Sequence, residues 1–212
     1  MEEAFWQSRW RENKIAFHEA RPNTLLERYV DRLALEPGAT IFLPLCGKTV
    51  DIDWLIAKGL LVKGVEFNEG AVQEVFARNN LSPIVNEVAG LKRYSTKQVE
   101  IFVGDLFKLT ADMLGTVHGI YDRAALVALP KALAAQYVHH IPAITKKAAQ
   151  LLISYDYDQS QMEGPPFSVP LGAVESFYEG VYSVEQLSEQ PITGPLADRC
   201  SGLEYAALLT AS

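Results

Sequence analysis

Short β-rich runs alternate with helical patterns along most of this sequence, and the alternation constrains the fold more than any other feature. The runs of apolar and β-branched residues cover residues 40–45, 60–67, 99–103, 117–121, 151–155 and 203–209. Strands that alternate with helices form βαβ units, and helices then cover both faces of a parallel sheet. The pattern therefore predicts an α/β fold with a doubly wound, mostly parallel sheet.

Helices are expected between these runs. Residues 50–58 follow the first run, Asn68 is a residue type that caps helix N-termini, and Pro130 stands where a further helix begins. Near the end of the chain, Ser183–Gln186 resembles a capping box, in which a serine and a glutamine three residues later satisfy each other's backbone donors. This last pattern predicts a short helix.

The length of 212 residues suits a single domain covering residues 1–212. Residues 36–212 would form its α/β core, and residues 1–35 precede the alternating pattern as an N-terminal helical cap. The aromatic side chains of this cap, Trp6, Trp10 and Phe17, fit two readings equally well. They suit a helix packed on the sheet, or a lid over a bound ligand.

Composition narrows the class of partner. The net charge of −7 disfavours nucleic acid and anionic membranes, which attract surfaces rich in Lys and Arg. The two cysteines, Cys46 and Cys200, indicate a reducing compartment rather than a disulfide framework, and their spacing does not suit a zinc site. With no signal peptide and no apolar run long enough to span a membrane, we expect a cytoplasmic protein without a metal.

A doubly wound sheet binds its ligand outside the carboxyl ends of the parallel strands. The residues that directly follow the predicted strands are therefore the first candidates for a site. They are Leu45–Gly47, Glu66, Gly104–Asp105, Asp122–Arg123 and Tyr155–Asp156.

The first of these turns does not suit a phosphate. A P-loop needs a glycine five places before its Gly-Lys pair, and that position holds Phe42. The three-glycine dinucleotide fingerprint is also missing, so Leu45–Gly47 suits a small ligand without phosphate, or a plain connection. Glu66 lies nineteen residues beyond Gly47, about where doubly wound folds bind a ribose diol, although a surface carboxylate is the alternative. Together the two features favour adenosine over NAD.

Asp122 and Arg123 carry opposite charges between apolar segments, where charges usually pair or line a site. A purely structural salt bridge is the alternative. Asp105 follows a strand where an acid can approach an adenine edge, and it is equally an ordinary loop residue. Cys46 is disfavoured as a nucleophile because no histidine lies near it in the sequence.

At these residues the sequence resembles the thiopurine S-methyltransferase family along nearly its whole length. The segments that carry the resemblance are Phe5–Trp10, Lys14–His18, Phe42–Lys48, Asp53–Trp54, Gly64–Glu66, Tyr121–Pro130, Ser154–Asp156 and Gly164–Phe167. Chance does not explain the occurrence of all these segments in this order.

The resemblance implies a Rossmann-like, class I S-adenosylmethionine-dependent methyltransferase fold, with an N-terminal helical lid over the cofactor. The cofactor-binding residues it implies are Trp10, Leu45, Glu66, Asp105, Leu106 and Arg123. Glu66 would bind the ribose, and Asp105 and Leu106 would flank the adenine. Phe17 and Arg123 would contact the acceptor, and Arg123, oriented by Asp122, would be the catalytic group.

The resemblance also implies the reaction: methyl transfer from S-adenosylmethionine to the sulfur of a thiopurine or a related soft thiol, leaving S-adenosylhomocysteine. Methylation of selenium or tellurium species is an alternative. A nicotinamide-dependent reductase and a cofactor-binding protein without catalysis also stay open. We expect a monomer that binds a small-molecule thiol acceptor.

Overall fold

A computed structural model describes residues 20–212 of the chain. Most of the expected helical cap, including Trp6, Trp10 and Phe17, lies outside these described residues. The described part of the cap holds helix α2 (Thr24–Tyr29) and the short 3-10 helix η1 (Val30–Leu33). Asn23 caps α2, since its side-chain oxygen accepts hydrogen bonds from the backbone N–H groups of Leu25 and Leu26.

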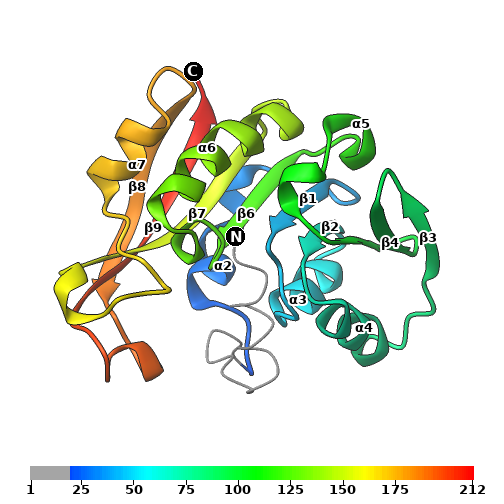
Figure 1. Ribbon diagram of the computed structural model, residues 1–212, viewed down its shortest axis with the longest axis horizontal. Helices are drawn as coiled ribbons and strands as arrows, with labels where there is room; N and C mark the ends of the chain where they lie inside the picture. The colour runs from blue at the N-terminus through cyan, green and yellow to red at the C-terminus, as the bar shows by residue number, and fades with distance from the viewer. Residues whose placement is uncertain (1–19) are drawn as a thin grey trace.

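Residues 20–212 form one nine-stranded sheet in the order β3-β4-β5-β2-β1-β6-β7-β9-β8 (Figure 1). The strands are β1 (Thr40–Pro44), β2 (Leu61–Glu66), β3 (Ile84–Val88), β4 (Leu91–Ser95), β5 (Val99–Val103), β6 (Gly119–Arg123), β7 (Ala149–Tyr157), β8 (Tyr182–Pro191) and β9 (Gly202–Ala211). The central strands β5, β2, β1, β6 and β7 are parallel, and the outer strands are antiparallel. The predicted doubly wound, mostly parallel sheet is confirmed.

Helices cover both faces of this sheet, and each face has its own apolar core. The remaining helices are α3 (Asp51–Ala57), α4 (Glu69–Arg78), α5 (Ala111–Leu114), α6 (Lys131–Thr145) and α7 (Leu171–Phe177), with 3-10 turns η2 (Leu106–Lys108), η3 (Leu126–Ala128), η4 (Gln159–Gln161) and η5 (Gly194–Leu196). Helices α5, α6 and α7 pack into one core, to which they contribute Leu114, Tyr137 and Val174 respectively. Leu25 and Ile52 bring α2 and α3 into the other, which α4 also joins. Figure 1 shows α6 lying across the β6–β7 part of the sheet.

The predicted helix at Ser183–Gln186 is wrong, because this segment belongs to β8. From Tyr182 to Glu185 buried or half-buried side chains alternate with exposed ones, which is the period of a strand. Backbone pairing of β8 with β9 supplies hydrogen bonds along ten residues. This pairing outweighs a capping signal that depends on two side chains.

The β3–β4 hairpin was not predicted from the sequence. Ala89 and Gly90 form its two-residue turn with positive φ angles of 49° and 83°, as hairpin turns with the twist of the sheet require. β3 is almost wholly exposed, so it has little of the apolar pattern by which buried strands are predicted. Within residues 20–212, no helix is long and apolar enough to cross a membrane.

Candidate functional site

The predicted site residues within the described part of the chain lie at one edge of the sheet, whereas Trp10 and Phe17 lie outside that part. Pro44 of β1 pairs with Val65 of β2, and Glu66 pairs with Val103 of β5, so these parallel strands end side by side. Leu45, Glu66 and Gly104 therefore lie at the same edge, and Arg123 ends the neighbouring parallel strand β6. The carboxyl ends of the strands thus bring together segments far apart in the sequence, as the doubly wound topology predicts.

Glu66 is a buried carboxylate, with only 6% of its surface exposed. One of its oxygens accepts the backbone N–H of Gly47 at 2.8 Å, and the other accepts that of Asn68 at 2.8 Å. Burial raises the pKa of Glu66 above its ordinary value, although these backbone N–H groups oppose the rise. A carboxylate offers about four acceptor positions. Glu66 can therefore accept hydrogen bonds from a pair of ligand hydroxyls as well.

The turn from Leu45 to Gly47 has an unusual backbone. Leu45 has a φ of 48° and Gly47 a φ of 53°, and a bulky residue such as leucine rarely adopts the left-handed region. Strain of this kind, about 1–3 kcal/mol, persists where surrounding contacts hold it, commonly at ligand sites. Here the N–H of Cys46 donates to Val65 O at 3.1 Å, and the N–H of Gly47 donates to Glu66.

Cys46 points into this packed region and is buried. Burial, followed by the neighbouring Glu66 carboxylate, raises the pKa of the Cys46 thiol well above its ordinary value. A thiol held in the protonated form is a poor nucleophile. The structure therefore agrees with the expectation that Cys46 does not act as one.

Asp105 and Leu106 follow β5 at the same edge. The N–H of Gly104 donates to Glu66 O at 2.9 Å, which ties this loop to the end of β2. The Asp105 side chain accepts the N–H of Phe107 at 3.0 Å and so begins the 3-10 turn η2, in which Leu106 is buried. The Leu106 carbonyl lies 3.0 Å from a ring nitrogen of His140 on α6. Helix α6 thereby fixes the loop.

Asp122 and Arg123 are adjacent in β6 and point to opposite faces of the sheet. Asp122 is fully buried on the α6 face, where it accepts hydrogen bonds from Tyr137 Oη at 2.6 Å, Gln150 Nε2 at 3.2 Å and the backbone N–H of Leu126 at 3.1 Å. Burial raises its pKa to about 6. Asp122 thus fixes the loop that follows Arg123, and the half-buried Arg123 extends toward the other face.

A third buried carboxylate, Asp51 at the start of α3, was not predicted as part of the site. It accepts a hydrogen bond from Tyr121 Oη at 3.0 Å and from the backbone N–H of Asn23 at 2.8 Å. It therefore joins β6, α3 and the beginning of α2. These partners are 70 and 28 residues away, so no local sequence pattern announces them.

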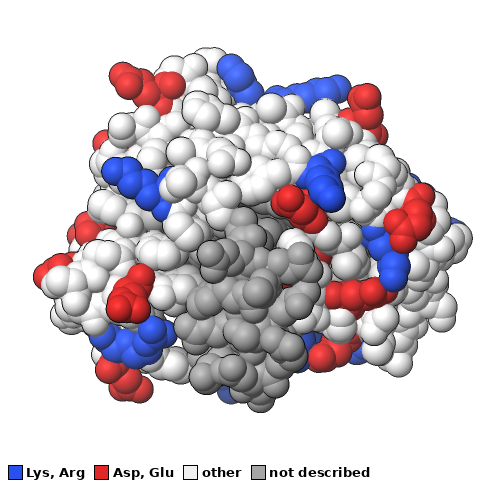
Figure 2. All heavy atoms as spheres, in the orientation of Figure 1, with Lys and Arg blue, Asp and Glu red and all other residues white. Residues whose placement is uncertain are grey.

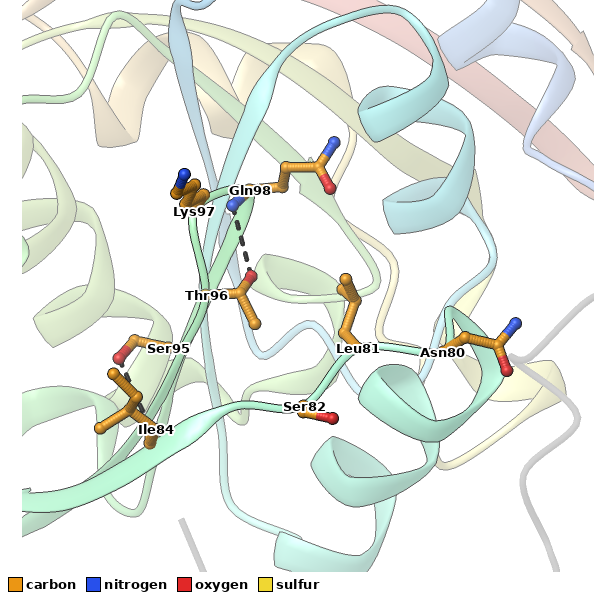
Figure 3. Close-up of a pocket in the computed structure, with 8 residues that line it drawn as sticks. All are labelled: Asn80, Leu81, Ser82, Ile84, Ser95, Thr96, Lys97 and Gln98. Carbon is orange, nitrogen blue, oxygen red and sulfur yellow. Dashed lines mark hydrogen bonds between the residues drawn. The ribbon is translucent and has the colours of Figure 1, made fainter.

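A pocket and the surface charges were also compared with the position of this site. The pocket in Figure 3, lined in part by Leu81, Ile84 and Thr96, lies at the amino-terminal end of β5, away from the strand ends that hold Glu66. On the face shown in Figure 2, the described Lys and Arg side chains are scattered among acidic ones instead of forming one continuous basic surface.

The fold of the described residues defines a class. Solved structures with a similar fold include an S-adenosylmethionine-dependent methyltransferase from Anabaena variabilis, with a TM-score of 0.67 at 12% identity, covering 99% of this chain and 95% of that one. Another is the magnesium protoporphyrin IX methyltransferase of Synechocystis with bound S-adenosylmethionine, with a TM-score of 0.64 at 14% identity, covering 97% and 90%. The chain has the fold of a class I S-adenosylmethionine-dependent methyltransferase.

The family follows from the sequence. The profile of the thiopurine S-methyltransferase family matches residues 1–207, and the chain belongs to this family. Similar proteins include the thiopurine S-methyltransferase of Xanthobacter autotrophicus, 43% identical over 210 residues and 99% of each chain. That of Pseudomonas aeruginosa strain UCBPP-PA14 is 40% identical over 195 residues, 92% of this chain and 89% of that one. These relatives support the predicted methyltransferase over a nicotinamide-dependent reductase.

Proposed function

We propose that this chain transfers a methyl group from S-adenosylmethionine to the sulfur of a thiopurine or of a related soft thiol. The relatives named thiopurine S-methyltransferase support this substrate class. The observation that carries the proposal is the buried Glu66 carboxylate. It accepts the N–H of Gly47, and its oxygens have further acceptor positions for the two hydroxyls of a ribose diol.

The residues at this edge fit an adenosine-containing cofactor. Glu66 would hold the ribose hydroxyls, and the strained backbone of Leu45 would contact the amino-acid part. Asp105 and Leu106 would flank the adenine from the loop after β5. The turn lacks the glycine-lined approach that a pyrophosphate needs, and this cofactor has none. Trp10, which lies outside the described residues, would cover the cofactor.

When bound, S-adenosylmethionine supplies a methyl group on a sulfonium, the electrophile of a direct displacement. The chain's own part is to hold the acceptor in line with that methyl group, and positioning of this kind can supply about 7–11 kcal/mol. Arg123 would hold an anionic acceptor with its guanidinium, which stays charged and presents several donors. Because the sulfur of a thiopurine ionises near neutral pH, no strong general base is needed. Phe17, also outside the described residues, would help enclose the acceptor.

Asp122 would act on Arg123 through the backbone. Its carboxylate fixes the N–H of Leu126 and contacts Tyr137 of α6, so the chain on the carboxyl side of Arg123 is fixed. Ala124, the next residue, has a φ of 61°. We propose that this anchored turn sets the direction in which Arg123 leaves the sheet.

The domain organisation, compartment, oligomeric state and partners of the chain are proposals too. We propose one methyltransferase domain over residues 1–212, active as a cytoplasmic monomer without a metal and without nucleic acid as a partner. The net charge of −7 supports the absence of nucleic acid, and the two buried cysteines without a disulfide support a reducing compartment. Selenium or tellurium anions are the alternative acceptors, since a cation such as Arg123 would attract them as well.

The test has two arms. Calorimetric titration with S-adenosylmethionine should show binding, and addition of 6-mercaptopurine should then yield its S-methylated product. An Arg123→Ala variant should lose most of the turnover, and full turnover by this variant would contradict the assigned role. Binding without turnover of 6-mercaptopurine would shift the acceptor to other soft thiols or to selenium or tellurium anions, and absence of binding would overturn the proposal.

A further inference from the structure

The turn that carries Gly47 is held from a second side, by a residue with no part in the site described so far. Arg78 is the last residue of α4, and its guanidinium reaches the loop that follows Gly47. Nη1 donates to the carbonyl of Lys48 at 3.0 Å, and Nη2 donates to the carbonyl of Thr49 at 3.2 Å. These peptide units directly continue the turn whose N–H group binds Glu66.

The same guanidinium is anchored to α3. Its Nε lies 2.6 Å from one oxygen of Asp53, and Nη2 lies 2.9 Å from the other, so the ion pair is bidentate. Asn79 adds a donor to Asp53 at 2.6 Å. Bidentate pairs are stronger and more directional than single contacts. Arg78 therefore has a fixed orientation, although about a third of its side chain is exposed.

Helix α4 is thus attached to the site at both of its ends. At its beginning, the N–H of Asn68 donates to Glu66, and the Asn68 side chain caps the helix through Ala71. At its end, Arg78 holds Lys48 and Thr49. Figure 1 shows α3 and α4 side by side at the lower right, with the loop between β1 and α3 next to them.

We propose that Arg78 is a positioning residue for cofactor binding, acting through the carbonyls of Lys48 and Thr49 to keep the N–H of Gly47 on the Glu66 carboxylate. The inference rests on the proposed cofactor site. Without the guanidinium, the carbonyls of Lys48 and Thr49 each lose a donor, although Thr49 keeps the N–H of Ile52 at 3.4 Å. The peptide units that continue the strained turn at Leu45 are then held less firmly. Glu66 would then lose the hydrogen bond that fixes one of its oxygens.

The variant that tests this is Arg78→Met, which keeps an unbranched apolar stem like that of arginine and removes every donor. We expect the Kd for S-adenosylhomocysteine, measured by calorimetry, to rise about tenfold, which corresponds to about 1.4 kcal/mol. The turnover at saturating S-adenosylmethionine should change less than about twofold, because Arg78 does not touch the reacting atoms. Arg78→Lys should bind almost as weakly, because a single ammonium cannot span Asp53 and both carbonyls.

Arg32→Met is the matched control. Arg32 also makes a paired contact with one carboxylate, Glu185, at 3.0 and 2.8 Å, but it lies on η1 and touches β8. This variant should bind S-adenosylhomocysteine like the unaltered chain. If it were equally weakened, the effect of Arg78→Met would be one of general stability, and the proposal would fail.

A second measurement needs no cofactor. The exchange rate of the Gly47 amide proton, followed by NMR, should rise in Arg78→Met and stay unchanged in Arg32→Met. Should Arg78→Met not fold, Arg78→Lys gives the same two readouts. Unchanged Gly47 exchange and unchanged Kd in a folded Arg78 variant would overturn the inference while leaving the proposed function intact. Failure of the unaltered chain to bind S-adenosylhomocysteine would instead remove the cofactor site and the inference together.

Discussion

Glu66 concentrates more of the site's chemistry than any other described side chain. It is buried, it ends β2, and it accepts backbone hydrogen bonds from two separate loops. Its position was predictable, because the distance from Gly47 matches a known arrangement of doubly wound folds. The support that Arg78 gives to the far side of the turn was not predictable, because Arg78 lies 30 residues from Lys48 and no local pattern joins them.

Replacement of Glu66 by alanine should weaken cofactor binding by about 10- to 100-fold, since hydrogen bonds to charged groups contribute about 1.5–3 kcal/mol. The loss should appear in the calorimetric Kd for S-adenosylmethionine. Glu175→Ala is the control, because Glu175 is an exposed carboxylate on α7, within the helix layer opposite α4. An unchanged Kd for Glu66→Ala would refute the ribose assignment.

Among the elements, the buried parallel strands and the longer helices were predicted, and the exposed edge strands were not. The strands β1, β2, β5, β6, β7 and β9 and the helices α3, α4 and α6 match the expected segments within a few residues. β3 and β8 lie at the two edges of the sheet and keep many exposed side chains, so their sequences carry a weak apolar pattern. Their strand conformation depends on pairing with β4 and β9, which no local window contains.

The β7–β9 ladder contains a position where only glycine fits. Gly202 pairs with Tyr157, and a Cβ added there would overlap the Asp156 carbonyl and lie 2.6 Å from the Cβ of Tyr157. Gly202→Ala therefore requires a backbone shift, and we expect it to lower the free energy of unfolding by about 1–3 kcal/mol. Urea denaturation measures the change.

Gly172 provides the opposite case on α7. It is exposed, and an added Cβ would meet no atom within 4 Å. Gly172→Ala should raise the free energy of unfolding by about 0.4–1 kcal/mol, because alanine restricts the unfolded chain. If the two glycines gave equal changes, close packing at Gly202 would not be their cause.

On the scale of the whole molecule, the free energy of unfolding depends on pH through two kinds of carboxylate. The folded structure raises the pKa of one kind and lowers the pKa of the other. Burial raises the pKa of Asp122 to about 6 and also raises that of Glu66. Hydrogen bonds lower the pKa values of two carboxylates nearer the surface, from Lys92 to the half-buried Glu69 and from Ser160 to the exposed Asp158. The lowered groups lose their stabilising contribution as pH falls, and the raised ones lose theirs as pH rises.

The contribution of Asp122 to this pH dependence can be measured. Its pKa rises from 3.8 to about 6 on folding, so the folded state holds the proton more tightly in that range. The contribution of Asp122 to the free energy of unfolding should therefore fall between about pH 4 and pH 6 and stay constant above. The change should be at most about 3 kcal/mol, since one pKa unit corresponds to about 1.4 kcal/mol.

Urea denaturation of the unaltered chain and of Asp122→Asn, at several pH values, isolates this contribution. The difference in free energy of unfolding, unaltered minus variant, should fall from pH 4 to pH 6 and then level off. Asparagine loses acceptor capacity at every pH, so its constant cost does not affect the slope. A difference that does not vary with pH would show that Asp122 ionises in the folded chain as it does in the unfolded one.

The placement of β9 between β7 and β8 has a consequence for biosynthesis. Residues 202–211 leave the ribosome after every other strand of the sheet, yet they form an interior strand paired on both sides. Until they emerge, β7 has an open edge and β8 has no partner, which is a state prone to aggregation. We expect the nascent chain to depend on chaperones until residues 202–211 have been synthesised, and nonsense mutations in the codons for these residues to be as damaging as early ones.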